Sequence, residues 1–289
     1  MWDASKAGQR WGHYARRVRA TVLIPSRDNA AGLKAALESL ARQTMRPELS
    51  VIVIDNGSRD NSVPLARQLA DRVLIESQPG SYRARNAGLA AAETDLVLTL
   101  DSDCRPVYDD WAARHLAALE AAPPDVFAMA APLMPEPGGD WWSARADVTP
   151  RPAFDAGGQP AYAVGGNRSF RADVVRELGG FPPRGADDAA LGLAARARGW
   201  RIGWLAEAPV YHTNPRGWRG YFRQMRKVGG YAGEAASGDP SVLRLAHEFV
   251  RAGVVGGKYF AKGNPREGQA AVLRITALAL GARGVWRAS

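Results

Sequence analysis

The chain has 289 residues, 46% of them hydrophobic, which is enough to bury a full core in one large domain. Its single cysteine excludes an intrachain disulfide, and no stretch of about 20 residues is free of charge, so we expect no transmembrane helix. The formal net charge of +9 indicates an anionic partner such as a phosphate group or an acidic membrane face. Basic and aromatic residues do not alternate as a nucleic-acid platform requires, so we expect no nucleic acid among the partners.

The first hundred residues alternate strand-like and helix-like segments. Apolar runs predict strands at 21–24, 51–54, 73–75 and 96–100, and helical spacing predicts helices at 30–43, 61–70 and 81–92. This alternation is typical of a parallel sheet whose crossover connections are right-handed. We therefore expect an α/β fold with a mostly parallel, Rossmann-like sheet flanked by helices.

The remainder of the chain is less regular. Residues 132–160 are rich in proline and glycine and include the adjacent Trp141 and Trp142, which indicates a long irregular segment. Further elements are predicted as a short helix ending at Gly179, a helix at 187–198, strands at 201–205 and 208–212, and helices at 217–228, 241–255 and 268–282. We divide the chain into a basic N-terminal arm at 1–19, an α/β domain at 20–215 and a C-terminal helical extension at 216–289.

Polar residues follow each of the four strands predicted in the first half. They are Pro25, Ser26, Arg27 and Asp28 after the first strand, Asp55 after the second, Arg83 and its neighbours after the third, and Asp101, Ser102 and Asp103 after the fourth. Singly, each group is also ordinary turn or helix-cap chemistry. Because ligands of open α/β sheets bind outside the carboxyl ends of the strands, we expect the four groups to share one ligand site.

The spacing of Asp101 and Asp103 suggests different roles for the two acids. Two positions of an extended strand separate their Cα atoms by about 6.6 Å, whereas Mg²⁺ needs its ligand oxygens at about 2.1 Å. We expect Asp103 to bind the metal and Asp101 to hold a ligand hydroxyl or a metal-bound water. Cys104 is interpreted as a small core residue rather than as a reactive thiol.

In this order and spacing, the chain resembles the family 2 glycosyltransferases, which are inverting enzymes of the GT-A fold. The resemblance rests on IVIDNGSRD at 52–60, the Arg-Asn-x-Gly run at 85–88, DSD at 101–103, GGNRSFRADVVRELGGF at 165–181, the acid pair Asp187-Asp188, and APVYH at 208–212. These segments fall within about two thirds of the chain. The resemblance implies a nucleoside-diphosphate-sugar donor (UDP-linked in the first instance), a Mn²⁺ or Mg²⁺ ion, and transfer with inversion to a hydroxyl acceptor.

The resemblance also assigns roles by position. Residues 20–104 would be the nucleotide-binding half, where Asp55 reads the base, Pro25 to Asp28 line the nucleoside, Arg83, Asp101 and Ser102 flank base and ribose, and Asp103 holds the metal. Residues 105–215 would be the acceptor half. A carboxylate-held cation also fits the chemistry, because a diphosphate leaving group develops negative charge.

In the acceptor half, Asp188 is assigned as the general base and Asp187 as the fallback, because the chain carries Asp where relatives commonly have Glu. Each of the remaining assignments has a structural alternative. Both acids are also ordinary at a helix N-terminus, and His212 is a metal ligand or a structural histidine. Gly165, Gly166 and Asn167 line the acceptor and donor-sugar side or form a tight turn, and Trp141 and Trp142 stack on an acceptor sugar or pack as core or lid residues.

Two other functions share part of this pattern. A nucleotidyltransferase uses a similar sheet and metal, but no glycine-rich loop directly follows the first strand. A nucleotide-sugar-binding protein without catalysis would not need Asp101, Asp103 and Asp188 together. By analogy, we expect a glycan or lipid-linked acceptor in cell-envelope, polysaccharide or glycolipid synthesis, and a cytoplasmic protein. Arg274, Arg283 and Trp286 suggest peripheral association with the inner face of the cell membrane.

Overall fold

The computed structural model describes residues 18–146, 160, 163, 165–183, 187–236 and 265–286, with the side chains of 228–236, 265, 275 and 278–286 left out. The predicted helix at 241–255 lies outside the described residues, as do residues 1–17 of the predicted basic arm and most of the second half of the predicted irregular segment.

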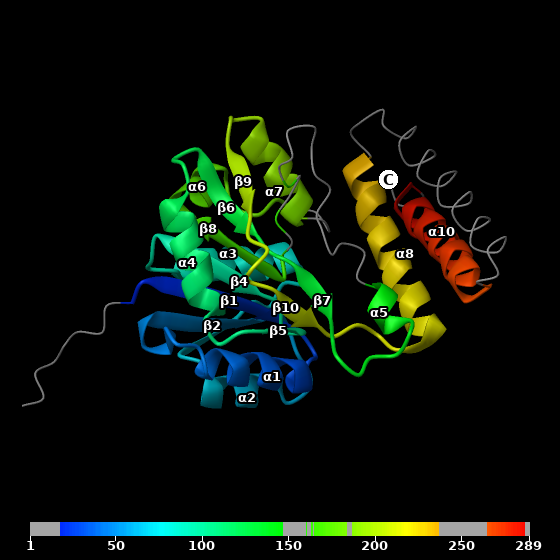
Figure 1. Ribbon diagram of the computed structural model, residues 1–289, viewed down its shortest axis with the longest axis horizontal. Helices are drawn as coiled ribbons and strands as arrows, with labels where there is room; N and C mark the ends of the chain where they lie inside the picture. The colour runs from blue at the N-terminus through cyan, green and yellow to red at the C-terminus, as the bar shows by residue number, and fades with distance from the viewer. Residues whose placement is uncertain are drawn as a thin grey trace, which may run out of the picture.

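A seven-stranded sheet forms the centre of the molecule (Figure 1). Its strands, in the spatial order β3-β2-β1-β4-β8-β6-β9, are β3 (Arg72–Ile75), β2 (Leu49–Asp55), β1 (Ala20–Ser26), β4 (Leu96–Leu100), β8 (Asn167–Arg171), β6 (Val126–Ala130) and β9 (Arg201–Trp204). All neighbouring pairs are parallel except those of β8, which runs antiparallel to both β4 and β6. The mainly parallel sheet predicted from the sequence is confirmed.

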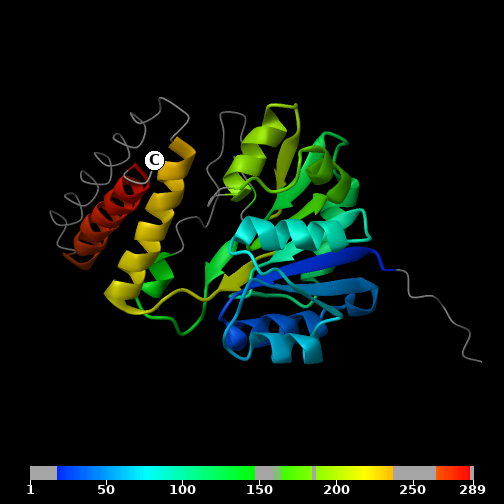
Figure 2. The ribbon, with the colours of Figure 1, turned by 180° about the vertical axis from the view of Figure 1, so that it is seen from behind.

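Helices cover both faces of this sheet, as Figures 1 and 2 show from opposite sides. They are α1 (Ala30–Ala41), α2 (Ser62–Leu69), α3 (Ser81–Ala91), α4 (Trp111–Ala121), α6 (Ala172–Glu177) and α7 (Asp187–Arg196), with a short 3₁₀ turn, η2 (Arg46–Glu48), before β2. Of β1, Val22 packs in the cluster that contains Trp111 of α4, and Leu23 packs in the cluster that contains Leu89 of α3. Successive strand residues point to opposite faces, so burial on both faces explains why β1, β2 and β4 are almost wholly apolar.

A second, three-stranded sheet begins just after the end of β4. It contains β5 (Cys104–Pro106), β10 (Val210–His212) and β7 (Leu133–Pro135), with β10 in the middle. The antiparallel pairing of β10 with β5 puts His212 opposite Cys104. This small sheet therefore brings the end of the second half of the chain next to the DSD segment.

The C-terminal part of the structure is helical, as predicted. Helices α8 (Gly217–Ala236) and α10 (Pro265–Trp286) lie side by side, and the short α5 (Ser143–Ala146) contacts α8 (Figures 1 and 2). A small apolar cluster that includes Tyr221, Met225 and Ala277 joins these helices. Among the described residues, no helix combines the length and the apolar character that a membrane span requires.

Candidate functional site

The ends of β1 and β2 present two buried polar atoms that have no hydrogen-bond partner among the described residues. Ser26 and Asp55 are paired in the strand register, and both residues are buried. Oδ2 of Asp55 accepts hydrogen bonds from the N–H groups of Gly57 and Ser58, both at 3.1 Å. Oδ1 of Asp55 and Oγ of Ser26 are buried and unpaired. Buried polar groups are nearly always paired, so this pair of atoms is suited to a bound ligand that carries hydrogen-bond donors and acceptors.

The loop that follows β1 is held in a left-handed turn. Asp28 has φ +48°, a conformation that costs energy for a residue other than glycine. Its Oδ1 accepts the N–H of Arg59 at 2.7 Å, and its own N–H donates to Oγ of Ser58 at 2.9 Å. The loops after β1 and β2 are thus locked together, with Arg27 exposed and Pro25 half-buried. Arg83, near the start of α3, is also half-buried, and its guanidinium lies 5.2 Å from the ring centroid of Tyr82.

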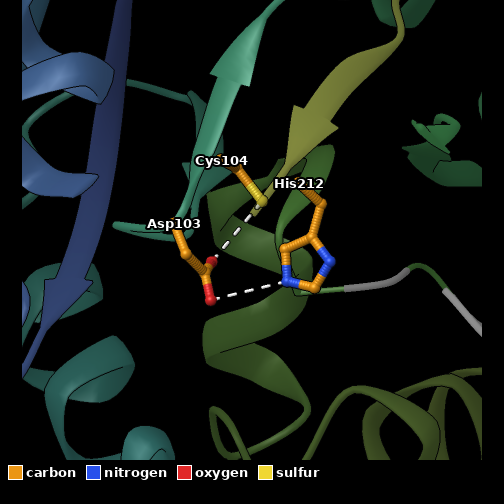
Figure 3. Close-up of side chains that lie close together, drawn as sticks. All are labelled: Asp103, Cys104 and His212. Atoms are coloured by element: carbon orange, nitrogen blue, oxygen red, sulfur yellow. Dashed lines mark hydrogen bonds and ion pairs between the residues drawn. The ribbon is translucent and has the colours of Figure 1, made fainter. Parts of the chain in front are cut away.

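Three side chains near the end of β4 could hold a metal ion. One ligand atom from each of Asp103, Cys104 and His212 lies within 4.8 Å of the others. Figure 3 shows these side chains pointing toward one another. Oδ2 of Asp103 lies 3.4 Å from Nε2 of His212, and Sγ of Cys104 lies 3.7 Å from Oδ1 of Asp103. Partial burial raises the pKa of Asp103, but the hydrogen bond from His212 and its charge outweigh this and leave the pKa of Asp103 below its usual value.

The chemistry of this donor set fits a divalent cation. A carboxylate oxygen suits Mg²⁺ and Mn²⁺, whereas an imidazole nitrogen and a thiol sulfur suit softer ions, so the combination favours Mn²⁺ over Mg²⁺. Asp101 lies outside the cluster, because its Oδ1 accepts a hydrogen bond from Nη2 of Arg85 at 2.9 Å. The buried Ser102 accepts hydrogen bonds from Nδ2 of Asn29, at its carbonyl (3.1 Å) and at its hydroxyl (3.2 Å).

Arg85 connects two acids that lie far apart in the sequence. Its Nη1 donates to both carboxylate oxygens of Asp187, at 2.9 and 2.7 Å, while its Nη2 donates to Asp101. Arg85 and Asp187 are almost fully buried, with 6% and 3% of their surfaces exposed. Asp187 is therefore tied up in an ion pair at the first turn of α7 and is poorly placed to take a proton.

The neighbouring Asp188 lies in a different environment. Its Oδ1 accepts the N–H of Ala189 at 2.8 Å, and its Oδ2 lies 3.4 Å from the N–H of Gly165. Burial raises the pKa of Asp188, the charge of Arg168 opposes this, and the charge of Asp187 adds to it, so that the net pKa is raised. Such a carboxylate is a better proton acceptor than an exposed aspartate.

The glycine pair before β8 allows close packing beside these charges. A Cβ on Gly165 would lie 2.5 Å from Nη2 of Arg85, and one on Gly166 would lie 3.3 Å from Oδ2 of Asp101. The backbone of both glycines therefore packs directly against charged side chains of the site, Arg85 beside Gly165 and Asp101 beside Gly166. A side chain at Gly165 would push Arg85 out of its ion pairs.

Asn167 serves the core rather than the surface of the site. It is fully buried, its Nδ2 donates to the carbonyls of Pro132 and Ala208 at 2.8 Å each, and its Oδ1 accepts from Trp111 at 2.9 Å. Nε2 of His115 lies 3.1 Å from the same oxygen. The sequence analysis placed Asn167 on the sugar side, but its side-chain groups are already occupied, so only Gly165 and Gly166 are retained there.

The two adjacent tryptophans pack against the helical part of the structure, beside α5 and α8. Trp142 lies 5.5 Å from the ring of Tyr221 on α8, and Trp141 lies under the guanidinium of Arg145 at 3.7 Å. Both are half-buried. Trp142 thus packs in the small C-terminal cluster, as the structural alternative proposed.

Three polar residues of the site region were given no role by the sequence analysis. Arg85 and Arg168 belong to the matched motifs, but nothing in a local pattern shows that an arginine will be buried among distant acids. Asn214, two residues after His212, is buried and both of its side-chain polar atoms lack a partner. Its position after a strand end was the only available signal.

The fold is thus α/β, and buried polar atoms and three possible metal ligands lie at the ends of its strands. The sequence profile described as "Glycosyl transferase family 2" matches residues 21–179, more than half of the chain. The chain therefore belongs to glycosyl transferase family 2.

Curated relatives and solved structures agree with this family. The chain is 28% identical over 169 residues to "Glycosyltransferase AglE" of Haloferax volcanii, covering 56% of this chain and 55% of AglE. It is 23% identical over 213 residues to "O-antigen chain rhamnosyltransferase RfbN" of Salmonella typhimurium, covering 68% and 67% of the two chains. The matched segment thus spans only about half the length of AglE.

Two structural likenesses establish the GT-A fold. "Mannosyltransferase PcManGT from Pyrobaculum calidifontis in complex with GDP-Man and Mn2+" superimposes with a TM-score of 0.60 at 22% identity, covering 94% of this chain and 79% of that one. TarS 1–349 of S. aureus, solved with UDP-GlcNAc, gives a TM-score of 0.55 at 16% identity, with coverage of 94% and 92%.

Proposed function

We propose that the protein is a metal-dependent, inverting glycosyltransferase that moves a sugar from a nucleoside-diphosphate donor, UDP-linked in the first instance, to a hydroxyl acceptor. The observation that carries this proposal is a group of three possible metal ligands. Asp103 and Cys104 follow β4, His212 ends β10, and one ligand atom of each lies within 4.8 Å of the others. In a parallel sheet the carboxyl ends of β4, β1 and β2 share one edge, so the unpaired atoms of Ser26 and Asp55 lie along the same edge.

The nucleotide half of the proposed site comprises residues 20–104. Oδ1 of Asp55 would accept an N–H of the base, and Ser26 with Pro25, Arg27 and Asp28 would line the nucleoside. Arg83, Asp101 and Ser102 would flank the base and ribose. The buried, unpaired state of Asp55 Oδ1 and Ser26 Oγ supports this assignment, because a ligand would satisfy both.

The leaving diphosphate needs a counter-charge. A Mn²⁺ ion held by Asp103 and His212, or Mg²⁺ as the weaker fit, would supply positive charge to the diphosphate oxygens. Cys104 is the third residue able to reach such an ion. The chain's own side chains would bind and orient the donor and take the acceptor proton.

The proton step falls to Asp188. The acceptor hydroxyl oxygen would form its new bond to the anomeric carbon as the bond from that carbon to the diphosphate breaks, and Asp188 would take the hydroxyl proton. Its raised pKa and its freedom from an arginine ion pair support Asp188 over Asp187. Gly165 and Gly166 would border the donor sugar beside it, and residues 105–215 as a whole would form the acceptor half.

The proposed acceptor is a glycan or lipid-linked molecule, and the proposed place of action is the cytoplasmic face of a membrane. Helix α8 supports membrane association: Arg219, Arg223 and Arg226 are exposed with helical spacing on one face, and no acidic residue occurs between 217 and 233. Arg274 lies on the described part of α10, whereas the side chains of Arg283 and Trp286 lie outside the described residues. We propose the 216–289 extension as the part that meets the membrane.

A turnover assay with a panel of nucleotide sugars tests the function. We expect Mn²⁺-dependent release of the nucleoside diphosphate from at least one UDP- or GDP-sugar, and loss of that release with a chelator. Release of pyrophosphate from a nucleoside triphosphate and a sugar phosphate would instead identify a nucleotidyltransferase. Tight binding with no release from any donor, in the presence of lipid and glycan acceptors, would identify a binding protein.

A further inference from the structure

The buried ion pairs of Arg85 link the donor side of the site to the helix that carries Asp188. One end of the guanidinium holds Asp101, two residues before Asp103, at 2.9 Å. The other end holds both oxygens of Asp187, the residue before Asp188, at 2.9 and 2.7 Å. Asp101 and Asp187 lie 86 positions apart in the sequence, and Arg85 contacts both.

We propose that Arg85 is a positioning residue, which sets the place of Asp188 at the start of α7 according to whether Asp101 is engaged by a donor nucleotide. This inference rests on the proposed function, because it assigns Asp188 as the base and Asp101 as a nucleotide contact. It assigns to Arg85 no contact with the reacting atoms.

The packing around Arg85 supports a rigid link. The guanidinium is planar and can grip a carboxylate through two parallel contacts, so it transmits a displacement that a flexible ammonium group would absorb. Gly165 packs closely against the guanidinium, since a Cβ at this position would lie 2.5 Å from Nη2. The N–H of Gly165 also faces Oδ2 of Asp188 at 3.4 Å, and its carbonyl accepts from Oγ1 of Thr99 on β4 at 2.6 Å.

The link continues on the α7 side through Asp187 itself. Oδ1 of Asp187, which accepts from Arg85, also accepts the backbone N–H of Asp188 at 3.1 Å. A movement of the Asp187 carboxylate therefore moves the backbone that carries Asp188. Arg168 influences the same acids through its charge, but its Nε and Nη1 donate to Thr99 and Ala163 and its Nη2 has no hydrogen-bond partner in the described part of the chain, so Arg168 forms no hydrogen-bonded bridge between the acids there.

Only part of the Asp101 carboxylate is used by Arg85. The side chain of Asp101 is 34% exposed, whereas that of Asp187 is 4% exposed. The donor-side end of the link can therefore be reached by a ligand, and the α7 end cannot. Binding of a ligand at Asp101 can therefore be transmitted through Arg85 and Asp187 to Asp188.

Hydrogen exchange on the full chain tests this inference without depending on catalysis. UDP and GDP, each with Mn²⁺, serve as probes, and their affinities are measured by calorimetry. In the wild type, the nucleotide that binds should slow amide exchange in the first turn of α7 at least about threefold. Wild-type binding without any change in α7 would overturn the proposal.

The variant Arg85→Lys keeps the charge but cannot hold two carboxylates in a fixed plane. We expect it to bind the nucleotide within about threefold of wild type, to lose the α7 response, and to lower kcat at least about tenfold with little change in the donor KM. A wild-type α7 response and kcat in folded Arg85→Lys would overturn the proposal. Asp187→Asn gives a second break in the same link if Arg85→Lys fails to fold. Arg46→Lys is the matched control, since Arg46 also pairs with an aspartate, Asp71, at 2.9 Å.

The Arg85 link and the proposed function can be contradicted separately. A wild type that binds nucleotide and protects α7 but transfers no sugar supports the link and contradicts the proposed function. A wild type that transfers sugar with an unchanged α7 contradicts the link and leaves the function standing.

Discussion

Asp187 and Asp188 are neighbours in sequence whose environments differ at every contact. Asp187 accepts hydrogen bonds from Arg85 at both oxygens, whereas the hydrogen bonds of Asp188 with described residues come from backbone N–H groups, and burial raises the pKa of Asp188. Removing the charge of a buried, paired aspartate leaves its arginine uncompensated, at a cost of about 3–5 kcal/mol. Replacement of Asp187 should thus lower the free energy of unfolding in addition to breaking the link from Arg85 to Asp188, whereas replacement of Asp188 should affect mainly turnover.

The metal-capable cluster makes a prediction for nucleotide binding. Asp103→Ala removes the carboxylate that lies between His212 and Cys104, so Mn²⁺ should no longer strengthen the binding of UDP or GDP measured by calorimetry. Cys104→Ser keeps a small polar atom and should weaken the Mn²⁺ effect less. Asp109→Ala, which changes an exposed aspartate, is the control. A full Mn²⁺ effect in Asp103→Ala would refute the metal assignment.

A buried histidine predicts how stability depends on pH. His115 is fully buried, and burial lowers its pKa to about 4, against the small opposing effect of its hydrogen bond with Asn167. Between pH 6.5 and about 4 the unfolded chain therefore binds a proton that the folded chain does not. The free energy of unfolding thus decreases as the pH is lowered through this range, by about 3 kcal/mol in all.

Denaturant unfolding at a series of pH values measures this dependence. The variant His115→Gln should be less stable at neutral pH, but its free energy of unfolding should fall less over the same pH range. Equal pH dependence of the two proteins would show that His115 does not stay neutral in the fold.

Part of the site could be predicted residue by residue. Ser26, Asp55 and Asp103 are candidates from the sequence alone, because the end of a strand is visible as the point where an apolar run stops. Arg85 was not assigned a role, because its partner Asp187 is 102 residues away and no local pattern records that contact. The buried hydrogen bonds of Asn167 could not be predicted for the same reason, because its partners Trp111 and Ala208 come from distant segments.

At the scale of elements, the packing leaves no room for a side chain at Gly165, in the turn before β8. In Gly165→Ala the new Cβ would lie 2.5 Å from Nη2 of Arg85, which two carboxylates hold in place. We expect a loss of about 1–3 kcal/mol in the free energy of unfolding together with a loss of turnover.

The control for this change is Gly203→Ala on β9. Its Cβ would meet the sulfur of Met129 at 2.4 Å, but a methionine side chain can move aside. This variant should lose stability without losing activity in proportion. If Gly165→Ala behaved in the same way, the turn would have no special relation to the site.

The predicted elements were most accurate where the pattern was strongest. The strands at 20–26, 49–55 and 96–100 and helix α3 match the predicted segments closely, and they carry long apolar runs or clear helical spacing. Strand β8 was not predicted, because its sequence NRSFR contains buried polar residues whose hydrogen-bond partners, such as Trp111, Thr99 and His115, lie on other segments. Its antiparallel direction follows from long-range pairing with β4 and β6 rather than from local sequence.

At the scale of the whole molecule, the net charge of +9 is concentrated in part on α8. We expect the full chain to sediment with vesicles that contain anionic lipid and not with neutral vesicles. Each basic residue near such a surface contributes about 1 kcal/mol, so Arg223→Gln/Arg226→Gln should weaken partitioning by about 30-fold. Arg67→Gln/Arg198→Gln removes the same charge elsewhere and serves as the control. Equal partitioning of the two double variants would exclude α8 as the membrane face.

The most direct test of the account is the turnover of Asp188→Asn with the donor that the wild type uses. The amide keeps the shape of the carboxylate but cannot take a proton, so turnover should fall by about 10²–10⁴-fold while donor affinity stays within about threefold of wild type. Near wild-type turnover in Asp188→Asn would contradict the assignment of the base and with it the proposed mechanism.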